Sequence, residues 1–567
     1  LHDPGYVYFG AGLDQSASLD RARDALLQAV ENLRQEKITA EEVERARTAL
    51  LNDFEKSQLE TGAFVRALSE FAATGSWRLF FLYRERLRKV TLDDVQRAGE
   101  RYLKPANRVL GIFVPTEHPD RAEIPTATGL EEALGTYRDD DFDPSPANIE
   151  SRITRRELSN GIQAALLQKK TRGGRVVVNL ALHWGDEKSL HNRAVACDFA
   201  GSMLIRGSRK HTRAQLKEAF EKLNATVSVG GEGASIEVRT ENLAAALRLV
   251  AEALREPAFR PAEFDEMKRA AITSAEAQRT DPAALAGVRL ARHLHLYPKG
   301  HPLYTPTIEE RIEKLHAAKL GDAEACYRDL FGATGADFVA VGEFDPGEMA
   351  RLVEELFGTW RTPLPFERVP ARYFDRPAFE NAFVTPDKAN AVLRAGLNVR
   401  MRDDHPDFPA IVLANYLLGG PSTARVPARV RDKEGLSYST YTTFNSSPFD
   451  ESAEFYVSSI FAPQNRGRVE RAIREELERA VRAGFTAGEV EEGRKSLLEA
   501  RRMSRMQDRS LVTRLGSYLF AKRTFAWDIE FESKIAALTA GQVNAALRRH
   551  IDPARLSVIV AGDFKTP

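Results

Sequence analysis

Apolar residues first recur at helical spacing in residues 19–37, at Leu19, Ala22, Leu26, Val30 and Leu33. Residues 39–42 read Thr-Ala-Glu-Glu, a capping box in which the Thr hydroxyl and the Glu carboxylate bond each other's free backbone N–H groups. A second box at residues 91–94 opens a helix that runs to Tyr102. Residues 6–9, Tyr-Val-Tyr-Phe, and 107–114 read as strands, so the pattern predicts a strand, several helices and a closing strand.

The last hundred residues repeat this order. A strand-like run at 455–457 is followed by a helical pattern at 469–481, capping boxes at Thr486 and Thr539, and an apolar run at 556–561. Thr39 and Thr486 lie 447 residues apart, and Thr91 and Thr539 lie 448 apart. Two caps kept in register over this distance indicate an internal repeat.

The middle of the chain holds a third copy. Its elements are a strand at 175–182, a helix capped at Thr212, a glycine-joined strand pair at 226–229 and 235–238, helices near 242–255 and 261–278, and a closing strand at 338–342. Strands grouped with helices between them predict an α+β fold of repeated domains, each an antiparallel β-sheet with helices packed on one face.

The first and last copies differ at their front ends. About ninety residues of the last copy precede its strand at 455–457, whereas almost nothing precedes residues 6–9, and residues 1–4 begin neither a signal peptide nor a recognisable protein start. An unpaired apolar strand exposes a sheet edge. We therefore expect residues 1–117 to be a partial domain, completed by polypeptide that was cleaved off or is a separate subunit.

Composition narrows the classes of partner. Lys plus Arg and Asp plus Glu each number 81, so the net charge is zero and favours neither nucleic acid nor an anionic membrane. The sequence has no apolar run of 18 residues, so we expect no membrane span. Cys197 and Cys326 lie far apart in apolar surroundings and are interpreted as small buried hydrophobic residues. On this interpretation the cysteines do not indicate whether the protein resides in an oxidising or a reducing compartment.

Candidate chemistry centres on residues 431–438, Arg-Asp-Lys-Glu-Gly-Leu-Ser-Tyr. A guanidinium group can bind a peptide carbonyl, and a phenol can donate to the oxyanion of a tetrahedral intermediate. The residues alone leave a second interpretation open, in which Arg431 caps a helix end and Tyr438 fills a sheet face. Two stretches contain histidines but are not expected to bind a metal. Residues 293–295 are interpreted as a helix end, and residues 403–407 as the N-terminal cap of the helix that follows them.

The Gly419-Gly420 pair, the Arg431, Gly435-Leu436 and Tyr438 motif, and the threefold repeat resemble the pitrilysin/insulinase (M16) family of zinc metallopeptidases. These are clamshell proteases of four related α+β domains. The resemblance implies five segments in this chain: the rear part of a second domain (1–117), an inter-half linker (118–150), a degenerate third domain (151–345), a connecting segment (346–377) and a fourth domain (378–567). The acidic run at 139–143 lacks the glycine and distal glutamate of a calcium loop and is interpreted as a solvated tether.

In that family a first domain carries the zinc motif His-x-x-Glu-His, with the two histidines on one helical face and the glutamate acting as general base. None of the eleven histidines here lies in such a motif. Residues 203–208 match the residues that usually come directly after the motif, so residues 198–202, Asp-Phe-Ala-Gly-Ser, occupy its place. The resemblance thus implies no metal ligand or cofactor in this chain and zinc on a missing N-terminal half.

The resemblance implies the C-terminal half of a metallopeptidase that hydrolyses peptides or unfolded polypeptides. Arg431 and Tyr438 would contact the substrate and its oxyanion, and Gly419, Gly420, Gly435 and Leu436 would line the peptide. The expected partners are the zinc-bearing half and the peptide substrate, and the chain alone is expected to be inactive. The alternative is a non-catalytic scaffold or peptide-binding subunit related to processing-peptidase and core proteins. Bacterial periplasm and cytoplasm both fit the composition.

Overall fold

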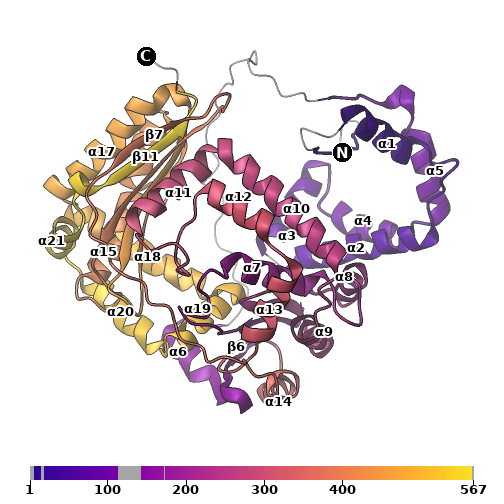
Figure 1. Cartoon of the computed structure of the whole chain (residues 1–567), viewed down its shortest axis with the longest axis horizontal. Coiled ribbons are helices and arrows are strands. Elements are labelled where there is room, and N and C mark those ends of the chain that lie inside the picture. The colour runs from indigo at the N-terminus through magenta and orange to yellow at the C-terminus, as the bar shows by residue number, and fades with distance from the viewer. Residues whose placement is uncertain (1–4, 14–17, 60, 113–141, 172, 565–567) are drawn as a thin grey trace.

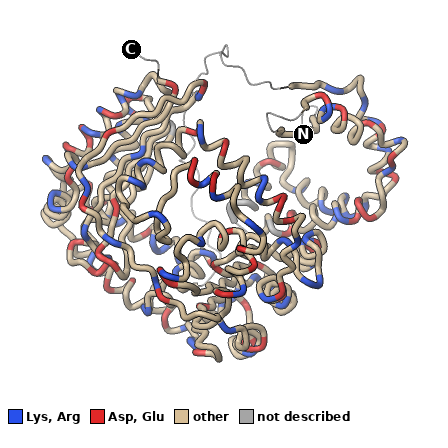
Figure 2. The backbone as a smooth tube through the Cα atoms, in the orientation of Figure 1, with Lys and Arg blue, Asp and Glu red and all other residues tan. Residues whose placement is uncertain are grey.

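The computed structural model describes residues 5–13, 18–59, 61–112, 142–171 and 173–564. An N-terminal arm of helices stands beside a body that contains two β-sheets (Figure 1). We call the parts the helical arm (residues 18–112), the first sheet unit (strands β1–β6 with the helices between them) and the second sheet unit (strands β7–β11 with the helices between them). Positively and negatively charged residues are interspersed along the backbone of all three parts, and neither sign dominates (Figure 2).

The helical arm contains the predicted helices. Its elements are α1 (Leu19–Glu31), α2 (Ala40–Leu59), α3 (Thr61–Ala73), α4 (Leu79–Leu87) and α5 (Leu92–Tyr102), followed by a 3₁₀ turn at Pro105–Asn107. Both predicted capping boxes form, because Thr39 and Thr91 exchange hydrogen bonds with Glu42 and Asp94. The arm contacts the first sheet unit through α2, where the Asn52 amide donates to the Glu221 carbonyl at 2.7 Å.

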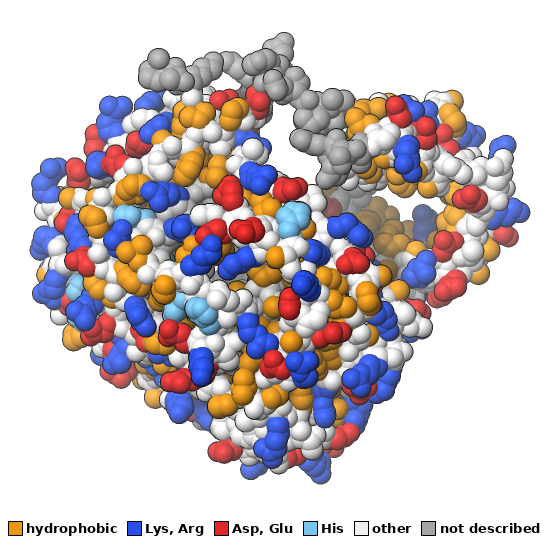
Figure 3. Space-filling view, in the orientation of Figure 1, with side chains coloured by type: hydrophobic (Ala, Val, Ile, Leu, Met, Phe, Trp, Pro, Cys, Tyr) orange, Lys and Arg blue, Asp and Glu red, His pale blue; other side chains and the backbone are white. Residues whose placement is uncertain are grey.

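The strands predicted at 6–9 and 107–114 do not form in the described residues 5–13 and 107–112. Tyr6 and Val109 are 91% and 98% exposed, and Val7, Tyr8 and Leu110 are exposed as well. A strand is held by hydrogen bonds to neighbouring strands, and the described chain offers these segments no partner. Hydrophobic side chains consequently remain on the surface of the arm, between charged ones (Figure 3).

The first sheet has six strands in the order β1-β2-β6-β3-β5-β4. Their bounds are β1 (Ile153–Glu157), β2 (Gln163–Gln168), β3 (Arg175–Ala181), β4 (Thr226–Gly230), β5 (Gly233–Arg239) and β6 (Asp337–Gly342). Only β2 and β6 pair in parallel; the other pairs are antiparallel. The helices of this unit are α7 (Ala194–Met203), α8 (Arg213–Lys222), α9 (Leu243–Arg255), α10 (Pro261–Ala277), α11 (Pro282–Leu294), α12 (Ile308–Ala317) and α13 (Leu320–Leu330).

The second sheet has five strands in the order β7-β11-β8-β10-β9. They are β7 (Glu380–Val384), β8 (Ala391–Val399), β9 (Ser437–Ser446), β10 (Ala453–Phe461) and β11 (Ser557–Gly562), with β7 and β11 parallel. The helices are α15 (Phe408–Gly419), α16 (Arg425–Pro427), α17 (Arg466–Ala483), α18 (Ala487–Ser504), α19 (Asp508–Phe520), α20 (Ala526–Ala537) and α21 (Ala540–His550). This order reproduces that of β2-β6-β3-β5-β4, so the repeat between the middle and last copies and the α+β class predicted from the sequence are confirmed.

The two sheet units exchange one helix each. Helix α19 of the second unit packs its Leu511, Val512 and Leu515 against the first sheet, around Val177 and Val339. Helix α11 of the first unit packs Ala286, Leu290 and Leu294 against Ile559 and Ala561 of the second sheet. Each sheet therefore carries its own helices on one face, as predicted, and a helix of the other unit on the opposite face. Neither unit buries its sheet fully without the other.

The two segments predicted to connect the domains, 118–150 and 346–377, are partly helical in their described parts. Helix α6 (Pro146–Arg152) begins within the described end of the predicted linker 118–150, and Phe142 and Ile149 are buried against the first sheet. Burial of the apolar side chains at these two positions offsets the cost of ordering the backbone there. Residues 113–141, including most of the acidic run, lie outside the described residues. The predicted connecting segment 346–377 opens with α14 (Pro346–Phe357).

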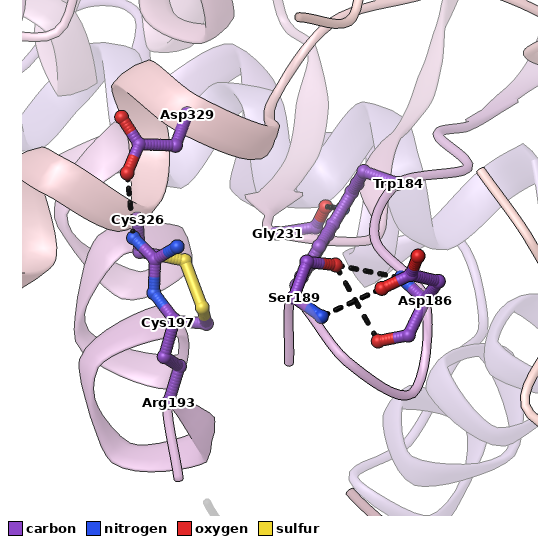
Figure 4. Close-up of a disulfide and its surroundings, with 8 residues drawn as sticks. All are labelled: Trp184, Asp186, Ser189, Arg193, Cys197, Gly231, Cys326 and Asp329. Atoms are coloured by element: carbon purple, nitrogen blue, oxygen red, sulfur yellow. Dashed lines mark hydrogen bonds and ion pairs between the residues drawn. A yellow bond between two sulfur atoms is a disulfide. The ribbon is translucent and has the colours of Figure 1, made fainter. Parts of the chain in front are cut away.

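Cys197 and Cys326 form a disulfide, which their interpretation as small buried hydrophobic residues missed, although both are buried. They lie on α7 and α13, are buried, and have Cα atoms 5.4 Å apart. An ion pair between Arg193 and Asp329, 3.0 Å long, spans the same two helices beside the disulfide (Figure 4). Sequence context could not reveal the bond, because 129 residues separate the cysteines and only the fold brings the helices together.

None of the helices in the described ranges combines the length and the apolar composition that crossing a bilayer requires.

Candidate functional site

Arg431 lies on an irregular helical turn. After the three residues of α16 the backbone forms a π-helix, Ala428–Lys433. The Arg431 side chain is 54% exposed, and its one ion pair in the described structure is with the adjacent Asp432 at 3.5 Å. π-Helices are rare and are often found at functional sites. The guanidinium group of Arg431 is therefore accessible to a ligand while its backbone is held in an unusual conformation.

Arg429 fastens this π-helix to its surroundings. Its Nε bonds Glu434, five residues further along the chain, and its Nη2 bonds Glu475 on α17 at 2.8 Å. The side chain of Glu476, completely buried on α17, lies 4.0 Å from Arg429 Nη1. Because these contacts bridge both ends of the turn and the helix behind it, Arg429 positions the segment that carries Arg431.

The chain turns from the π-helix into strand β9 at Gly435. Gly435 has φ of +62°, in the left-handed region that glycine adopts without a steric penalty. In the β9–β10 register Ile460 pairs with Ser439 and Phe461 with Ser437, so Tyr438 is the extra residue of a β-bulge. Bulges redirect side chains and recur beside active sites. The Tyr438 side chain itself lies outside the described part of the structure.

Buried hydroxyl groups fix the strand on both sides of this bulge. Thr440 Oγ1 donates to Ser437 Oγ at 2.9 Å and lies 2.8 Å from Ser459 Oγ on β10. Ser437 Oγ in turn donates to the Ile460 carbonyl at 2.7 Å. Satisfied buried polar networks hold a backbone rigidly. The bulged position of Tyr438 is thus a fixed feature of the strand.

The other predicted site residues have packing roles as well. Leu436 is 3% exposed and belongs to the core of the second sheet unit. Gly419 is buried at the end of α15, where a Cβ atom would lie 2.5 Å from the Thr442 nitrogen, so the helix approaches β9 closely only with glycine there. Gly420 and Gly435 are exposed. Substrate contact by these four residues stays a prediction, and for Leu436 and Gly419 only backbone atoms could fulfil it.

The degenerate counterpart of the zinc motif lies on α7. Asp198 and Ser202 occur one turn apart and both are exposed. Desolvation by neighbouring atoms raises the pKa of the Asp198 carboxyl, while the charge of Arg311 opposes that shift. One carboxylate and one hydroxyl do not fit zinc, which is held in proteins by three or four Cys, His or carboxylate ligands. We derive no metal chemistry from α7.

One group of three potential ligands converges among the described residues: His405, Asp407 and His550, with ligand atoms within 4.8 Å of one another. The Asp407 carboxylate accepts from His550 Nε2 at 2.7 Å and from Arg549, and the Asp407 N–H donates to His405 Nδ1 at 3.1 Å. Hydrogen bonds at Asp407 hold the group together, and two of them come from α21. It fastens the start of α15 to the end of α21.

The capping interpretation of residues 403–407 is therefore wrong in its detail. Asp407 occupies the N-cap position of α15, but its side chain makes no capping bond. Burial opposes ionisation of Asp407, yet hydrogen bonds from His550 and Arg549 hold the pKa of its carboxyl below the ordinary range. Asp403 pairs with Arg523, also across the fold. The partners lie more than a hundred residues away, so local sequence could not identify them.

The histidines at 293–295 lie at a helix end, as predicted. Helix α11 ends at Leu294, and His293 Nε2 lies 2.9 Å from the Pro377 carbonyl oxygen. His295 Nε2 faces Glu454 Oε2 on β10 at 3.4 Å. The two imidazoles thus serve different contacts between the sheet units.

Comparisons with known proteins agree with this architecture. Residues 318–497 match the family model described as the peptidase M16 inactive domain. The chain is similar to the non-peptidase homolog YmxG of Helicobacter pylori, with 19% identity over 410 residues, which covers 68% of this chain and 89% of the relative.

Two solved structures show the same fold. The peptidase M16 inactive domain from Pseudomonas fluorescens superposes with a TM-score of 0.64 at 18% identity, over 73% of this chain and 99% of that one. The periplasmic protease PqqL from Escherichia coli superposes with a TM-score of 0.60 at 15% identity, over 96% of this chain and 63% of that one.

Proposed function

We propose, from the premise that this chain carries a non-catalytic C-terminal portion of the peptidase M16 family, that it holds a peptide substrate for a zinc site on another polypeptide segment. The observation that supports the proposal best is the join between the π-helix and β9, where an exposed arginine and a bulged tyrosine are separated by one short turn. A guanidinium group binds peptide carbonyls, and a phenol donates to an oxyanion without ionising.

The helical arm supports the proposed partner. Its helices and caps correspond in order to α17–α21, which makes residues 5–9 and 108–112 the counterparts of β10 and β11. In the second sheet β8 lies between these two strands and pairs antiparallel with both. A strand of this kind, supplied by a zinc-bearing N-terminal half, would cover the exposed apolar side chains of both segments. That half would also supply the metal ligands that α7 lacks.

The test is a peptide-hydrolysis assay with this chain reconstituted with a zinc-bearing half. Tyr438→Phe should lower kcat by about tenfold or more, in line with the loss of an oxyanion donor, while KM and the fold persist. Arg431→Ala should chiefly raise KM, because the guanidinium would bind the substrate backbone.

Two neighbours provide matched controls. Tyr441→Phe changes the same atom three residues along β9, and Lys433→Ala removes a charge from the same π-helix. Neither should alter kcat or KM. If the reconstituted Tyr438→Phe enzyme has an unchanged kcat, Tyr438 does not stabilise the oxyanion and has a structural role only.

A second candidate function is that of a non-catalytic scaffold or peptide-binding subunit. The name of the Helicobacter relative, a non-peptidase homolog, favours it. Mass spectrometry of the native assembly separates the two functions. A companion polypeptide with His-x-x-Glu-His supports the peptidase half, and its absence from an intact assembly supports the scaffold. In both cases the isolated chain should bind no stoichiometric zinc, and one zinc per molecule would contradict both.

The disulfide bears on the compartment. Disulfides persist in oxidising surroundings and are rare in the reducing cytosol. Cys197 and Cys326 therefore favour an oxidising compartment, such as the periplasm, over the cytoplasm. Alkylation and mass spectrometry of the native protein after rapid acid quenching should find both cysteines protected, and modified free thiols would contradict the assignment.

A further inference from the structure

The first sheet unit contains a cavity of about 740 Å³ that lies apart from the Arg431 site. Its walls come from α13, the loop 256–260 between α9 and α10, Arg209, and the segment 360–363 that follows α14. Helices α9, α13 and α14 lie together in the lower part of the body in Figure 1. Cavities of 300–1,000 Å³ are the usual size of small-molecule sites.

The cavity has a strong excess of positive charge. Five arginines line it against a single carboxylate, Glu324; they are Arg209, Arg255, Arg260, Arg328 and Arg361. Clustered arginines repel one another unless anions compensate them. The excess is local, because the whole chain has no net charge.

Most of these arginines are not neutralised by protein carboxylates. Arg255 donates to the Leu356 carbonyl and to Thr359 Oγ1, and Arg260 donates to the Ser208 carbonyl at 2.8 Å. Arg209 and Arg361 are exposed and make no side-chain hydrogen bond or ion pair within the described chain. Two guanidinium groups are thus available to an anion from solution.

The remaining lining is mainly aromatic. Four rings, those of Phe259, Tyr327, Phe331 and Trp360, make up most of it, and Pro257, Ala258 and Pro363 complete it. The Tyr327 ring lies between two phenylalanine rings, with centroids 5.4 Å from Phe259 and 5.5 Å from Phe331. Burial raises the pKa of Tyr327 to about 12, and its neutral hydroxyl donates to the Leu254 carbonyl at 2.8 Å. The aromatic ring of a ligand could pack edge-to-face or offset-stacked against these side chains.

The walls are held in place before any ligand arrives. Phe259 has φ of +45°, an uncommon and strained conformation for a bulky side chain, and such strain clusters at ligand sites. Ser208 and Pro257 form an isolated β-bridge, so the Arg209 turn is tied to the loop before α10. The disulfide at Cys326 anchors α13 next to Tyr327. A preorganised cavity loses little entropy on binding.

We propose that this cavity binds a free small molecule that carries a phosphate or carboxylate group on an aromatic body. The acidic group pairs with Arg209 and Arg361, since guanidinium groups bind such oxyanions through two parallel hydrogen bonds. The aromatic body packs against the rings of Tyr327, Phe331 and Trp360. The site lies in the unit whose zinc motif is degenerate, and it does not depend on the function proposed above.

Isothermal titration calorimetry on the full chain tests separately the recognition of the acidic group and of the aromatic body. The three probes are phenyl phosphate, inorganic phosphate and phenol. Phenyl phosphate should bind at least about tenfold more tightly than either fragment, because only it satisfies both the arginines and the rings. Trp360 provides a second readout, since its fluorescence should change with phenyl phosphate and a Trp360→Phe variant should lose that change. If phenyl phosphate binds no more tightly than inorganic phosphate, the aromatic half of the proposal fails.

Arg209→Glu combined with Arg361→Glu should weaken phenyl phosphate binding by about tenfold or more. Both side chains are exposed and lack protein partners in the described chain, so the thermal midpoint should be unchanged. Arg351→Glu on the exposed face of α14, outside the cavity lining, is the control, and it makes at one position the charge change that the double variant makes at each of two. Equal weakening by Arg351→Glu would show that only general charge attracts the probe, and the proposal would be overturned.

Discussion

The two sheet units share their strand order and differ most in one connection. In the first unit a regular helix, α8, begins with the Thr212 capping box and leads into the short hairpin β4–β5. In the second unit the three residues of α16 and a π-helix take its place, and β9 and β10 extend to ten and nine residues with a bulge at Tyr438. The irregular features around Arg431 and Tyr438 therefore lie where the second unit diverges from the first.

The two units also differ in the interactions that join their helices. The first uses the Cys197–Cys326 disulfide between α7 and α13. The second uses a buried ionic group, in which the fully buried Asp528 bonds Arg514 and the Tyr518 hydroxyl on α19. The same strand order is thus stabilised by a disulfide in one unit and by a buried ionic group in the other. Both units keep the sheet core and the packing of the exchanged helix.

The largest effect should come from breaking the helix exchange. Leu515→Ala on α19 should destabilise the protein by about 2–5 kcal/mol, because it opens a cavity against the first sheet. Hydrogen exchange should then quicken in β3 and β6, although the substitution lies in the second unit's sequence.

Leu290→Ala on α11 is the reciprocal variant and should quicken exchange in β8 and β11 instead. A control in the segment between the two sheet units, Leu364→Ala, changes an exposed leucine and should have little effect. If each variant loosened only the sheet nearest in sequence, the exchanged packing would be disproved.

Removal of the disulfide should have the next largest effect. Cys197→Ser with Cys326→Ser should lower the free energy of unfolding by about 2–4 kcal/mol, since the bond restricts the unfolded chain. Denaturant unfolding with and without a reductant measures this. The wild type should shift on reduction and the double variant should not, and a reductant-dependent shift in the variant would point to another cause.

The smallest effect concerns pH and the start of α18. The side chain of Arg425 bonds Glu489, which also closes the Thr486 capping box, and these bonds lower the pKa of Glu489 from its ordinary 4.5 to about 2. A lowered folded-state pKa gives stability that is present above pH 4.5 and is lost as the pH falls toward 2. Because the pair is partly exposed, the contribution is about 1 kcal/mol or less.

Glu489→Gln should remove that part of the acid dependence, which thermal unfolding between about pH 2 and 6 would measure. Glu492→Gln changes an exposed glutamate of the same helix that forms no ion pair within the described chain, and should leave the dependence intact. The corresponding helix of the first unit, α10, begins at Arg260-Pro261 without a side-chain cap and should lack this contribution. Identical acid profiles for Glu489→Gln and the wild type would contradict the assignment.

Several features could be predicted because they are local. The capping boxes at Thr212, Thr486 and Thr539 each depend on a residue three positions away, and all three form. The π-helix at Arg431 could not be predicted, because the ion pairs of Arg429 with Glu434 and Glu475 hold it and one of these partners lies 46 residues away. The bulge at Tyr438 likewise depends on the register with β10.

The sequence by itself determined the helix starts, the repeated α+β order and the absence of a His-x-x-Glu-His motif, since each follows from residues close together in the chain. Tertiary structure alone decided the disulfide, the exchange of α11 and α19, the contact of Asp407 with His550, and the arginine-lined cavity. These features join residues up to hundreds of positions apart. Their energy depends on distance in space, which local patterns do not encode.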